Sequence, residues 1–464
     1  MSSLFGTMSV ALQSLLAQQG AMGVVANNIA NANTPGYSRE IPILEENPPV
    51  LMGNTMVGTG VSMSSVESVR DNILNLRIQQ ETSQQSSLQS YLGSMNQVQT
   101  LFNETQNTGL QSYLSNFFNS FQSLATDPTN ASLRQTTLTA GQDLAGAFSQ
   151  TSQNLATIQQ GLDQSVVQTV QQINQLTAQV ANLNQQIQTI SNDQQNPGSL
   201  EDQRDEVLQN LSTLVDTAVV YADDGTVSVS TSNGTLLVCG NQSDALTTQG
   251  NPATGMHDIY AQGTDVTSTM AGGQLQGLLN ARDNGIPSTQ SSLDNLAAGL
   301  ISAVNTQQNA GYDLNGGQGV DFFTPFTPSA SGSNAGAAAT MTVAITNPDQ
   351  IAASSDGSSG DNSNATAMAS LQNAAIVSGQ TPGNYYANLV DQVGNTVSNA
   401  TAEQQAVGLV LQQLTNQQSA VSGVSLDEEA ANLVLYQRAY EAAARVISVV
   451  DELTSTTIDM FTPS

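Results

Sequence analysis

The two ends of this 464-residue chain carry the same repeat, in which apolar residues are spaced alternately three and four positions apart. Near the start the repeat comprises Met8, Ala11, Leu15, Gln18, Met22, Val25 and Ile29. Near the finish it comprises Leu433, Tyr436, Tyr440, Ala443, Ile447, Val450, Thr454, Thr457 and Phe461. This spacing forms an apolar seam along one side of a helix, and such a seam is stable only against another helix. We therefore expect two terminal helices that pair with each other, with other copies of the chain, or with both.

The charge balance narrows the choice of partners. The chain has 37 acidic and 8 basic residues, all of the latter arginine, and a formal net charge of −29. Recognition of phosphate groups needs clustered cations, so neither nucleic acid nor an anionic membrane is an expected partner. Only 10% of the residues are charged, so amides and hydroxyls must cover much of the surface. Such a surface packs against copies of itself without desolvating many charges, although adaptation to an acidic habitat is an alternative source of this composition.

The cysteine and histidine content excludes other classes. The single Cys239 rules out an internal disulfide, and the single His257 rules out a multi-histidine metal site and the usual histidine-based triads. No run reaches the ~20 apolar residues of a membrane span. Residues 1–30 lack the positively charged start of a cleaved secretory signal.

The pattern along the chain is helical, then β, then helical. Helices are predicted over residues 3–31, 66–108, 110–124, 128–215 with a break at 196–198, 273–310, and 362 to the end with breaks near 381–383 and 422–423. Residues 38–65 are expected to be extended and loop-like. Short β runs at 218–221, 226–230 and 235–239 are joined by Asp-Gly and Asn-Gly hairpin signals, and one further strand is expected at 340–345.

The predicted fold class is thus mainly α with an inserted small β domain, and with a terminal coiled coil formed by both chain ends. Residues 1–36 and 425–464 form the expected terminal domain. A long-helix bundle is assigned to residues 37–215, 273–310 and 361–424. The rest, residues 216–272 and 311–360, is expected to be a β-rich or irregular domain that faces outward.

Helix start signals account for most acidic residues that stand out. Asp127-Pro128 is predicted to start a helix, Ser199 and Asp202 to cap another, and Ser425–Glu428 to form a capping box. The acidic run 427–429 lies in a first helical turn, where carboxylates favour the helix dipole, so capping is preferred over a paired-carboxylate catalytic site. Asp313 begins a sequence like a calcium loop, but a turn is preferred because the terminal glutamate is missing. We predict no enzyme activity, no cofactor and no metal.

Two stretches at the chain ends resemble signatures of a known superfamily. Residues 27–39, Asn-Asn-Ile-Ala-Asn-Ala-Asn-Thr-Pro-Gly-Tyr-Ser-Arg, resemble the N-terminal signature of flagellar rod, hook and hook-associated proteins. The run 422–453 resembles their C-terminal signature. Segments of the middle, such as Arg282-Asp283, Phe322-Phe323 and Gly360-Asp-Asn362, resemble the hook-associated protein 1 family.

The resemblance implies a structural protein of the bacterial flagellum, at the junction between hook and filament. It would be extracellular, exported unfolded by the flagellar type III system without a cleaved signal, and would serve motility. Its implied partners are itself in a ring of identical subunits, the hook protein, the next hook-associated junction protein on the filament side, and an export chaperone that binds the C-terminal helix. A hook or distal-rod subunit is the main alternative. A flagellum-associated cell-wall hydrolase and a chaperone are further alternatives.

Within this interpretation, residues of both signatures have expected roles in assembly. Asn27, Asn28, Asn31 and Asn33 would satisfy backbone groups where the first helix ends, Pro35 and Gly36 would reverse the chain, and Tyr37 would pack beneath the reversal. Arg39 would pair with a neighbour's carboxylate. The candidate seam and interaction residues are Met8, Leu15, Met22 and Ile29 on the first helix and Leu433, Tyr436, Tyr440, Ile447 and Val450 on the last. Packing within one subunit only is the alternative for each.

Overall fold

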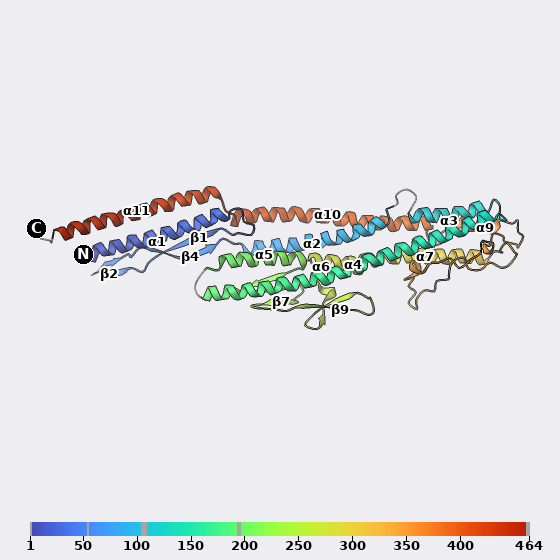
Figure 1. The fold of residues 1–464 in the computed structure, drawn as a ribbon, viewed down its shortest axis with the longest axis horizontal. Helices are drawn as coiled ribbons and strands as arrows, with labels where there is room; N and C mark the ends of the chain where they lie inside the picture. The colour runs from blue at the N-terminus through green and yellow to red at the C-terminus, as the bar shows by residue number, and fades with distance from the viewer. Residues whose placement is uncertain (1, 53–54, 104–108, 193–195, 461–464) are drawn as a thin grey trace.

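Long helices run nearly parallel to one axis and give the molecule an elongated shape, with both termini at the same end (Figure 1). The computed structural model describes residues 2–52, 55–103, 109–192 and 196–460. The last seam position, Phe461, lies outside these residues. The α-helices are α1 (Ser2–Asn31), α2 (Asn72–Leu101), α3 (Leu110–Leu124), α4 (Ala131–Asn192), α5 (Gly198–Leu214), α6 (Gly273–Asn280), α7 (Ile286–Asn309), α8 (Ala337–Thr340), α9 (Ser363–Ser370), α10 (Pro382–Ser422) and α11 (Leu426–Asp459).

The strands form four small antiparallel sheets. One, with the order β5-β6-β7-β8, and another, β11-β10-β9, lie between α5 and α6 in the sequence. Their strands are β5 (Ala218–Tyr221), β6 (Val227–Ser230), β7 (Leu236–Cys239), β8 (Gln242–Ser243), β9 (Leu246–Gly250), β10 (His257–Ala261) and β11 (Thr264–Asp265). The hairpin signals are confirmed, because Gly225 and Gly234 take φ angles of 82° and 87° in the turns. The predicted fold class, mainly helical with small inserted sheets, is confirmed.

The described part of residues 38–65 forms hydrogen-bonded strands, where the sequence predicted an extended loop. Strand β1 (Glu40–Glu46) pairs with β4 (Val61–Ser68), and β2 (Val50–Met52) pairs with β3 (Thr55–Val57) between them. We call β1–β4 the β ribbon. It packs on α1 at the end of the molecule that holds both termini (Figure 1). The sequence did not indicate these strands because prolines at 42, 48 and 49 favour loops. Strand β1 tolerates Pro42 because a two-stranded ribbon consists only of edge strands.

One large hydrophobic core joins the long helices. Phe117 on α3 lies at its centre, with ring centroids 5.5 Å from Phe322 and 5.6 Å from Phe323. Both of the latter residues are fully buried, although they come from the stretch 311–360 that was expected to face outward. The strand expected at 340–345 is replaced by the end of α8 and one isolated bridge between Val343 and Phe323. This segment therefore lies across the helices as an irregular strap, held by its apolar side chains.

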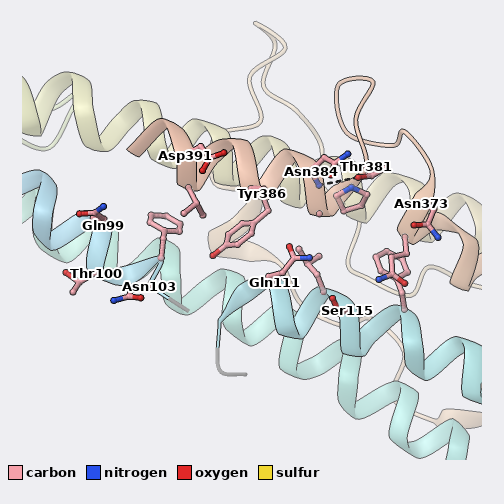
Figure 2. A pocket seen from close by; sticks show the side chains of 18 of the residues that line it. Gln99, Thr100, Asn103, Gln111, Ser115, Asn373, Thr381, Asn384, Tyr386 and Asp391 are labelled. Carbon is pink, nitrogen blue, oxygen red and sulfur yellow. Dashed lines mark hydrogen bonds between the residues drawn. The ribbon is translucent and has the colours of Figure 1, made fainter. Parts of the chain in front are cut away.

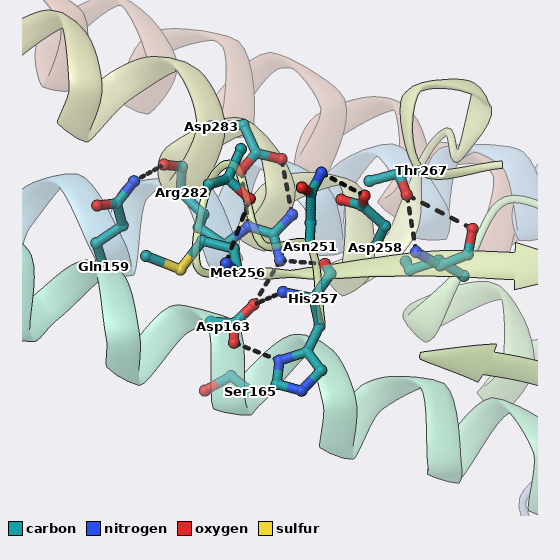
Figure 3. A network of polar contacts seen from close by, with 12 residues as sticks. Gln159, Asp163, Ser165, Asn251, Met256, His257, Asp258, Thr267, Arg282 and Asp283 are labelled. Carbon is teal, nitrogen blue, oxygen red and sulfur yellow. Dashed lines mark hydrogen bonds and ion pairs between the residues drawn. The ribbon is translucent and has the colours of Figure 1, made fainter. Parts of the chain in front are cut away.

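A buried ion-pair network ties strand β10 to α4 (Figure 3). Arg282, in the π-helical turn Ala281–Gly285, donates from Nη1 to Asp163 Oδ1 at 2.7 Å and to the backbone oxygen of His257 at 2.8 Å. His257 Nδ1 lies 2.6 Å from Asp163 Oδ2. Burial alone would raise the pKa of Asp163, but hydrogen bonds from His257 and the charge of Arg282 outweigh burial and lower that pKa. The network therefore holds β10 against the helical core.

Two of the predicted helix caps are wrong. Helix α4 starts at Ala131, and Asn130 rather than Asp127 accepts the backbone N–H groups of Ser132 and Leu133. Helix α5 starts at Gly198 without a side-chain cap, because Asp202 binds Arg70 instead. The Ser425 cap of α11 is confirmed, with its side chain accepting the N–H of Glu428.

Candidate assembly site

The predicted C-terminal seam is the covered face of α11. Helix α11 lies along α1, and the seam positions from Leu433 to Thr457 are all buried or half-buried. Ala443 and Val450 are the most buried of them, whereas Leu435 and Val449, on another face, are exposed. The three-four spacing of the sequence thus identified which side of α11 packs. Whether these residues also contact another subunit stays a prediction.

The N-terminal seam is only partly covered. Ala11 and Val25 are buried, and Leu15 and Met22 are half-buried, but Met8 and Ile29 at the two ends are exposed. A second stripe of α1 is buried as well, formed by Ala17, Ala21, Val24 and Asn28. The sequence repeat did not indicate this second stripe.

The second stripe has a partner in the β ribbon. Strands β1 and β4 both contact α1, and a Cβ on Gly20 would lie 2.9 Å from the Met63 side chain. Asn47 donates to Gln13 at 2.5 Å on the same side. Helix α1 is therefore the middle layer of three, with α11 on one side and the β ribbon on the other (Figure 1). We call α1, α11 and the β ribbon the terminal unit.

The asparagine-rich motif holds the turn that leaves α1. The buried side chain of Asn28 donates to the backbone oxygen of Glu40 at 2.8 Å and to Glu429 Oε2 at 3.1 Å. Its own oxygen accepts from the Tyr37 hydroxyl at 2.8 Å and from the Glu40 N–H at 2.9 Å. One amide therefore joins α1, the start of β1 and the start of α11, and all four of its hydrogen bonds are made within the chain.

The other motif residues lie in the turn around Asn28, and their role in assembly stays a prediction. Asn31 donates to the backbone oxygen and the side chain of Asn27, which closes the last turn of α1. Gly36, at φ 78°, and Pro35 reverse the chain on the surface. Tyr37 is half-buried beneath this turn, and burial together with nearby carboxylates raises its pKa above the usual value. Asn33 is exposed.

Arg39 forms ion pairs with carboxylates of its own chain. Its Nε donates to Glu429 Oε1 at 2.8 Å, and its Nη1 donates to Glu428 Oε2 at 2.7 Å. This differs from the expected pairing with a neighbour's carboxylate. Glu429 is only 1% exposed, so its charge depends on Arg39 and Asn28 for compensation. The acidic residues in the first turn of α11 thus bind Arg39 and Asn28 as well as complementing the helix dipole. The sequence pattern did not distinguish these two roles.

A second ion-pair cluster joins the terminal unit to the long helices. Arg70, just before α2, contacts Glu201 and Asp202 near the start of α5 and donates to the backbone oxygen of Gly198 at 2.6 Å. Asp202 also accepts the N–H of Ser38 at 3.1 Å. The sequence analysis missed Arg70 and assigned Asp202 to capping. The scarcity of arginine could have indicated a role for Arg70, because the chain has only eight arginines.

A cavity of about 490 Å³ lies between these two clusters. The turn after α1, the facing sides of α2 and α5, and the end of α10 line it. Asp205 on α5 is largely buried here, and this burial raises its pKa to about 6. The cavity therefore lies between the turn after α1 and the helices α2, α5 and α10 of the core.

The described residues form cavities but no cluster suited to holding a metal. A cavity of about 1120 Å³ lies far from the termini, between α2, α3 and α10 (Figure 2). Amide, hydroxyl and aromatic side chains line it, with Asp391 as the one carboxylate among its described lining residues. Within the described part of the chain, no group of three or more histidine, cysteine or acidic side chains gathers where it could hold a metal. None of the described helices has the length and apolar character needed to cross a membrane.

Comparisons with known proteins point to one family along the chain. The family described as Flagellar hook-associated protein FlgK helical domain matches residues 95–323. The Flagella basal body rod protein family matches residues 8–37, and the family Flagellar basal body rod FlgEFG protein C-terminal matches residues 417–460. The two terminal matches therefore cover both helices of the α1–α11 pair.

Similar whole proteins agree with these family matches. The fold resembles the solved structure of the flagellar hook junction protein FlgK from Burkholderia pseudomallei, with a TM-score of 0.67 at 20% identity, over 75% of this chain and 100% of that one. Flagellar hook-associated protein 1 of Salmonella typhimurium is 28% identical over 539 residues, which cover 96% of this chain and 97% of that protein. The protein of the same name from Bacillus subtilis is 32% identical over 495 residues, which cover 98% and 97%. This chain therefore belongs to the flagellar hook-associated protein 1 family.

Proposed function

We propose that this chain is a structural subunit of the bacterial flagellum that forms the junction between hook and filament. The solved relative is described as a flagellar hook junction protein, and the relatives found by sequence are hook-associated proteins. The observation that carries the assembly role is the terminal unit, where most of the large apolar side chains that stay exposed in the described chain are found. Exposed apolar surface of this extent is typical of a protein interface.

Assembly would proceed through the terminal helices after unfolded export by the flagellar type III system. Residues 1–36 and 425–464 would form the inner, polymerising part of a ring of identical subunits. Residues 37–215, 273–310 and 361–424 would form the supporting helical part, and residues 216–272 and 311–360 the outward-facing part. The proposed residues of the interface are Met8, Leu15, Met22, Ile29, Leu433, Tyr436, Tyr440, Ile447 and Val450.

The ring would have flagellar neighbours on both sides. The hook protein would lie below it and the next hook-associated junction protein above it, outside the cell. A flagellar export chaperone would bind the C-terminal helix before export. The apolar face of α11 supports this last proposal, because an isolated helix with such a face needs cover until it is exported.

Deletion of residues 2–36 or 425–464 tests the proposal. Each deletion should abolish incorporation into flagella and motility in a strain that lacks the native protein. Circular dichroism and denaturant unfolding of the purified variants must show that the long-helix core is still folded. A deletion variant that still assembles would refute the proposal.

A hook or distal-rod subunit is the second candidate, because both chain ends match basal body rod families. Stoichiometry separates the two candidates. Quantitative imaging of a labelled chain should give a short ring, with few copies in each flagellum. A hook or rod subunit would give a long tube with many.

A further inference from the structure

The outer face of α11 combines apolar side chains with two arginines. The sides of α11 that α1 does not cover carry an exposed row of residues. The row comprises Leu435, Ala442, Val446, Val449, Leu453 and Met460. Arg438 follows Leu435 by three positions and Arg445 follows Ala442 by three, so both arginines lie next to this row. We call the row and its two arginines the α11 outer face.

The two arginines have no carboxylate partner in the described chain. Of the eight arginines, only Arg77, Arg438 and Arg445 are exposed and form no ion pair with a described residue. Glu441 lies four residues before Arg445, a spacing that permits a surface pair, but the two side chains do not form one. In a chain with a net charge of −29, two unpaired arginines on one apolar face are unusual.

The β ribbon offers the complementary surface. On β1, Ile41, Ile43 and Glu45 alternate to the side away from α1, and the register places Glu67 opposite Ile41 on that same side. Ile41 and both glutamates are exposed, and neither carboxylate has a described ion-pair partner. No basic residue occurs between Arg39 and Arg70. We call this surface the acidic ribbon face.

These two faces cannot meet within one chain. Helix α1 lies between α11 and the β ribbon, so the α11 outer face and the acidic ribbon face point away from each other (Figure 1). When two different faces of one subunit are complementary, copies join head to tail, and the series closes into a ring or continues as a helix. A layered unit with unlike outer faces therefore suits a ring.

The spacing of the charges permits simultaneous pairing. Arg438 and Arg445 are seven residues apart on a helix, which separates them by roughly 10 Å along the axis. Glu45 and the position opposite Glu67 are four residues apart on a strand, which separates them by roughly 14 Å. Long arginine side chains can cover this difference, and the apolar rows of both faces would be buried between the charges.

We propose that the α11 outer face of one subunit docks on the acidic ribbon face of a second copy of this chain. Arg438 and Arg445 pair there with Glu45 and Glu67, and the apolar row of α11 covers Ile41 and Ile43. The proposal rests on the proposed function, since it names the surfaces through which the terminal units join. It adds a direction to the ring, because each subunit gives α11 to one neighbour and the ribbon to the other.

Charge reversal with rescue tests this contact in living cells. The double variant R438E/R445E should lower incorporation into flagella by about tenfold or more, because attraction becomes repulsion between like charges. The variant E45R/E67R should do the same. All four changes together restore the opposite signs and should recover most of the incorporation.

Two matched controls separate the contact from general charge effects. R77E reverses the third unpaired arginine, which lies on α2 outside the terminal unit, and should leave incorporation unchanged. E46R changes the glutamate that alternates to the other side of β1 and should have little effect. Loss of incorporation in these controls equal to that of R438E/R445E would overturn the proposal.

Disulfide trapping provides an independent readout. In a chain carrying C239S, the pair R438C and E45C should give covalent multimers on assembled flagella under mild oxidation, whereas R438C with E46C should not. Rings that form without this crosslink would overturn the proposal. If the terminal deletions abolish assembly but R438E/R445E assembles normally, only this contact is wrong; if the deletions still assemble, the proposed function itself fails.

Discussion

The terminal unit and the long-helix core differ in how they bury apolar surface. The core is one continuous cluster that extends from Met95 to Val393 and contains five packed phenylalanines. The buried apolar residues of α1 and α11 belong to no such cluster and are small: Ala11, Ala17, Ala21, Val24, Val25, Ala443 and Val450. The large apolar residues of the terminal unit are half-buried or exposed instead.

This difference indicates which part of the chain folds alone. Burying a large apolar side chain stabilises a fold by about 1.5–3 kcal/mol, whereas ordering one backbone residue costs about 1–2 kcal/mol. The core has many large buried side chains to offset that cost, and the terminal pair has few. We therefore expect the terminal unit to gain much of its order from neighbouring subunits, as coupled folding and binding requires.

The largest expected effect is in the core. Replacing Phe117 with alanine removes the ring that contacts Phe121, Phe322 and Phe323, and should destabilise the isolated chain by about 3–5 kcal/mol. Guanidinium unfolding of the wild type and F117A measures it. V25A in the terminal pair is the matched comparison and should shift the midpoint of this transition little. An equal loss from V25A would show that the terminal pair folds cooperatively with the core.

Breaking the buried pair at Asp163 should have a smaller effect. D163N removes one of the two carboxylates that Arg282 binds, and the pair with Asp283 remains, so we expect a loss of about 1–3 kcal/mol. At a pH above the ordinary pKa of an aspartate, the lowered pKa of Asp163 stabilises the wild type. This contribution disappears as the pH falls through the native pKa. Below about pH 4, the free energy of unfolding of D163N should therefore depend less on pH than that of the wild type. An unchanged acid transition would show that Asp163 contributes little.

A change at Arg39 should act locally. R39A leaves the buried Glu429 without its arginine, and we expect faster amide exchange in α1 and the start of α11. Global unfolding, which reports the core, should change by less than about 1 kcal/mol. R77A is the control because Arg77 has no ion-pair partner in the described chain. A large global loss in R39A would contradict the separation of the two regions.

The cavity between the regions should give a smaller, pH-dependent signal. Burial raises the pKa of Asp205 to about 6, so the native chain binds a proton there at a higher pH than the unfolded chain does. The wild type should therefore gain stability relative to D205N as the pH falls from 7 to 5, by on the order of 1–2 kcal/mol. Denaturant unfolding at several pH values measures this difference. A constant difference between the two proteins would refute it.

The smallest effect is expected on the exposed row of α11. L453S should change the stability of the isolated chain by less than about 0.5 kcal/mol, because the side chain is already exposed. The same change should lower incorporation into flagella. Thermal unfolding and flagellar fractionation compare these two readouts, and normal incorporation would show that this row is not an interface.

Periodicity predicted the helices and the packed face of α11 because both depend on local spacing. The seam from Leu433 to Thr457 is the covered face, and the breaks near Pro197 and Gly423 end helices as expected. The motif around Asn28 was also found, although only the structure shows that its side chain joins three elements.

Contacts between distant segments were not predictable from spacing. Arg39 and Glu429 are 390 positions apart, and nothing local distinguishes their ion pair from a dipole effect. The β ribbon was hidden by prolines and glycines that favour loops. Phe322 and Phe323 were missed as core because the strap around them has no regular period.

Hydrogen exchange of the isolated chain and of assembled flagella tests the central claim most directly. We predict that amides of α1 and α11 exchange rapidly in the isolated chain while those of α4 and α7 stay protected. In assembled flagella the amides of α1 and α11 should become protected as well. If α1 and α11 are protected in the isolated chain as strongly as α4, the terminal unit folds without its neighbours and the account is wrong.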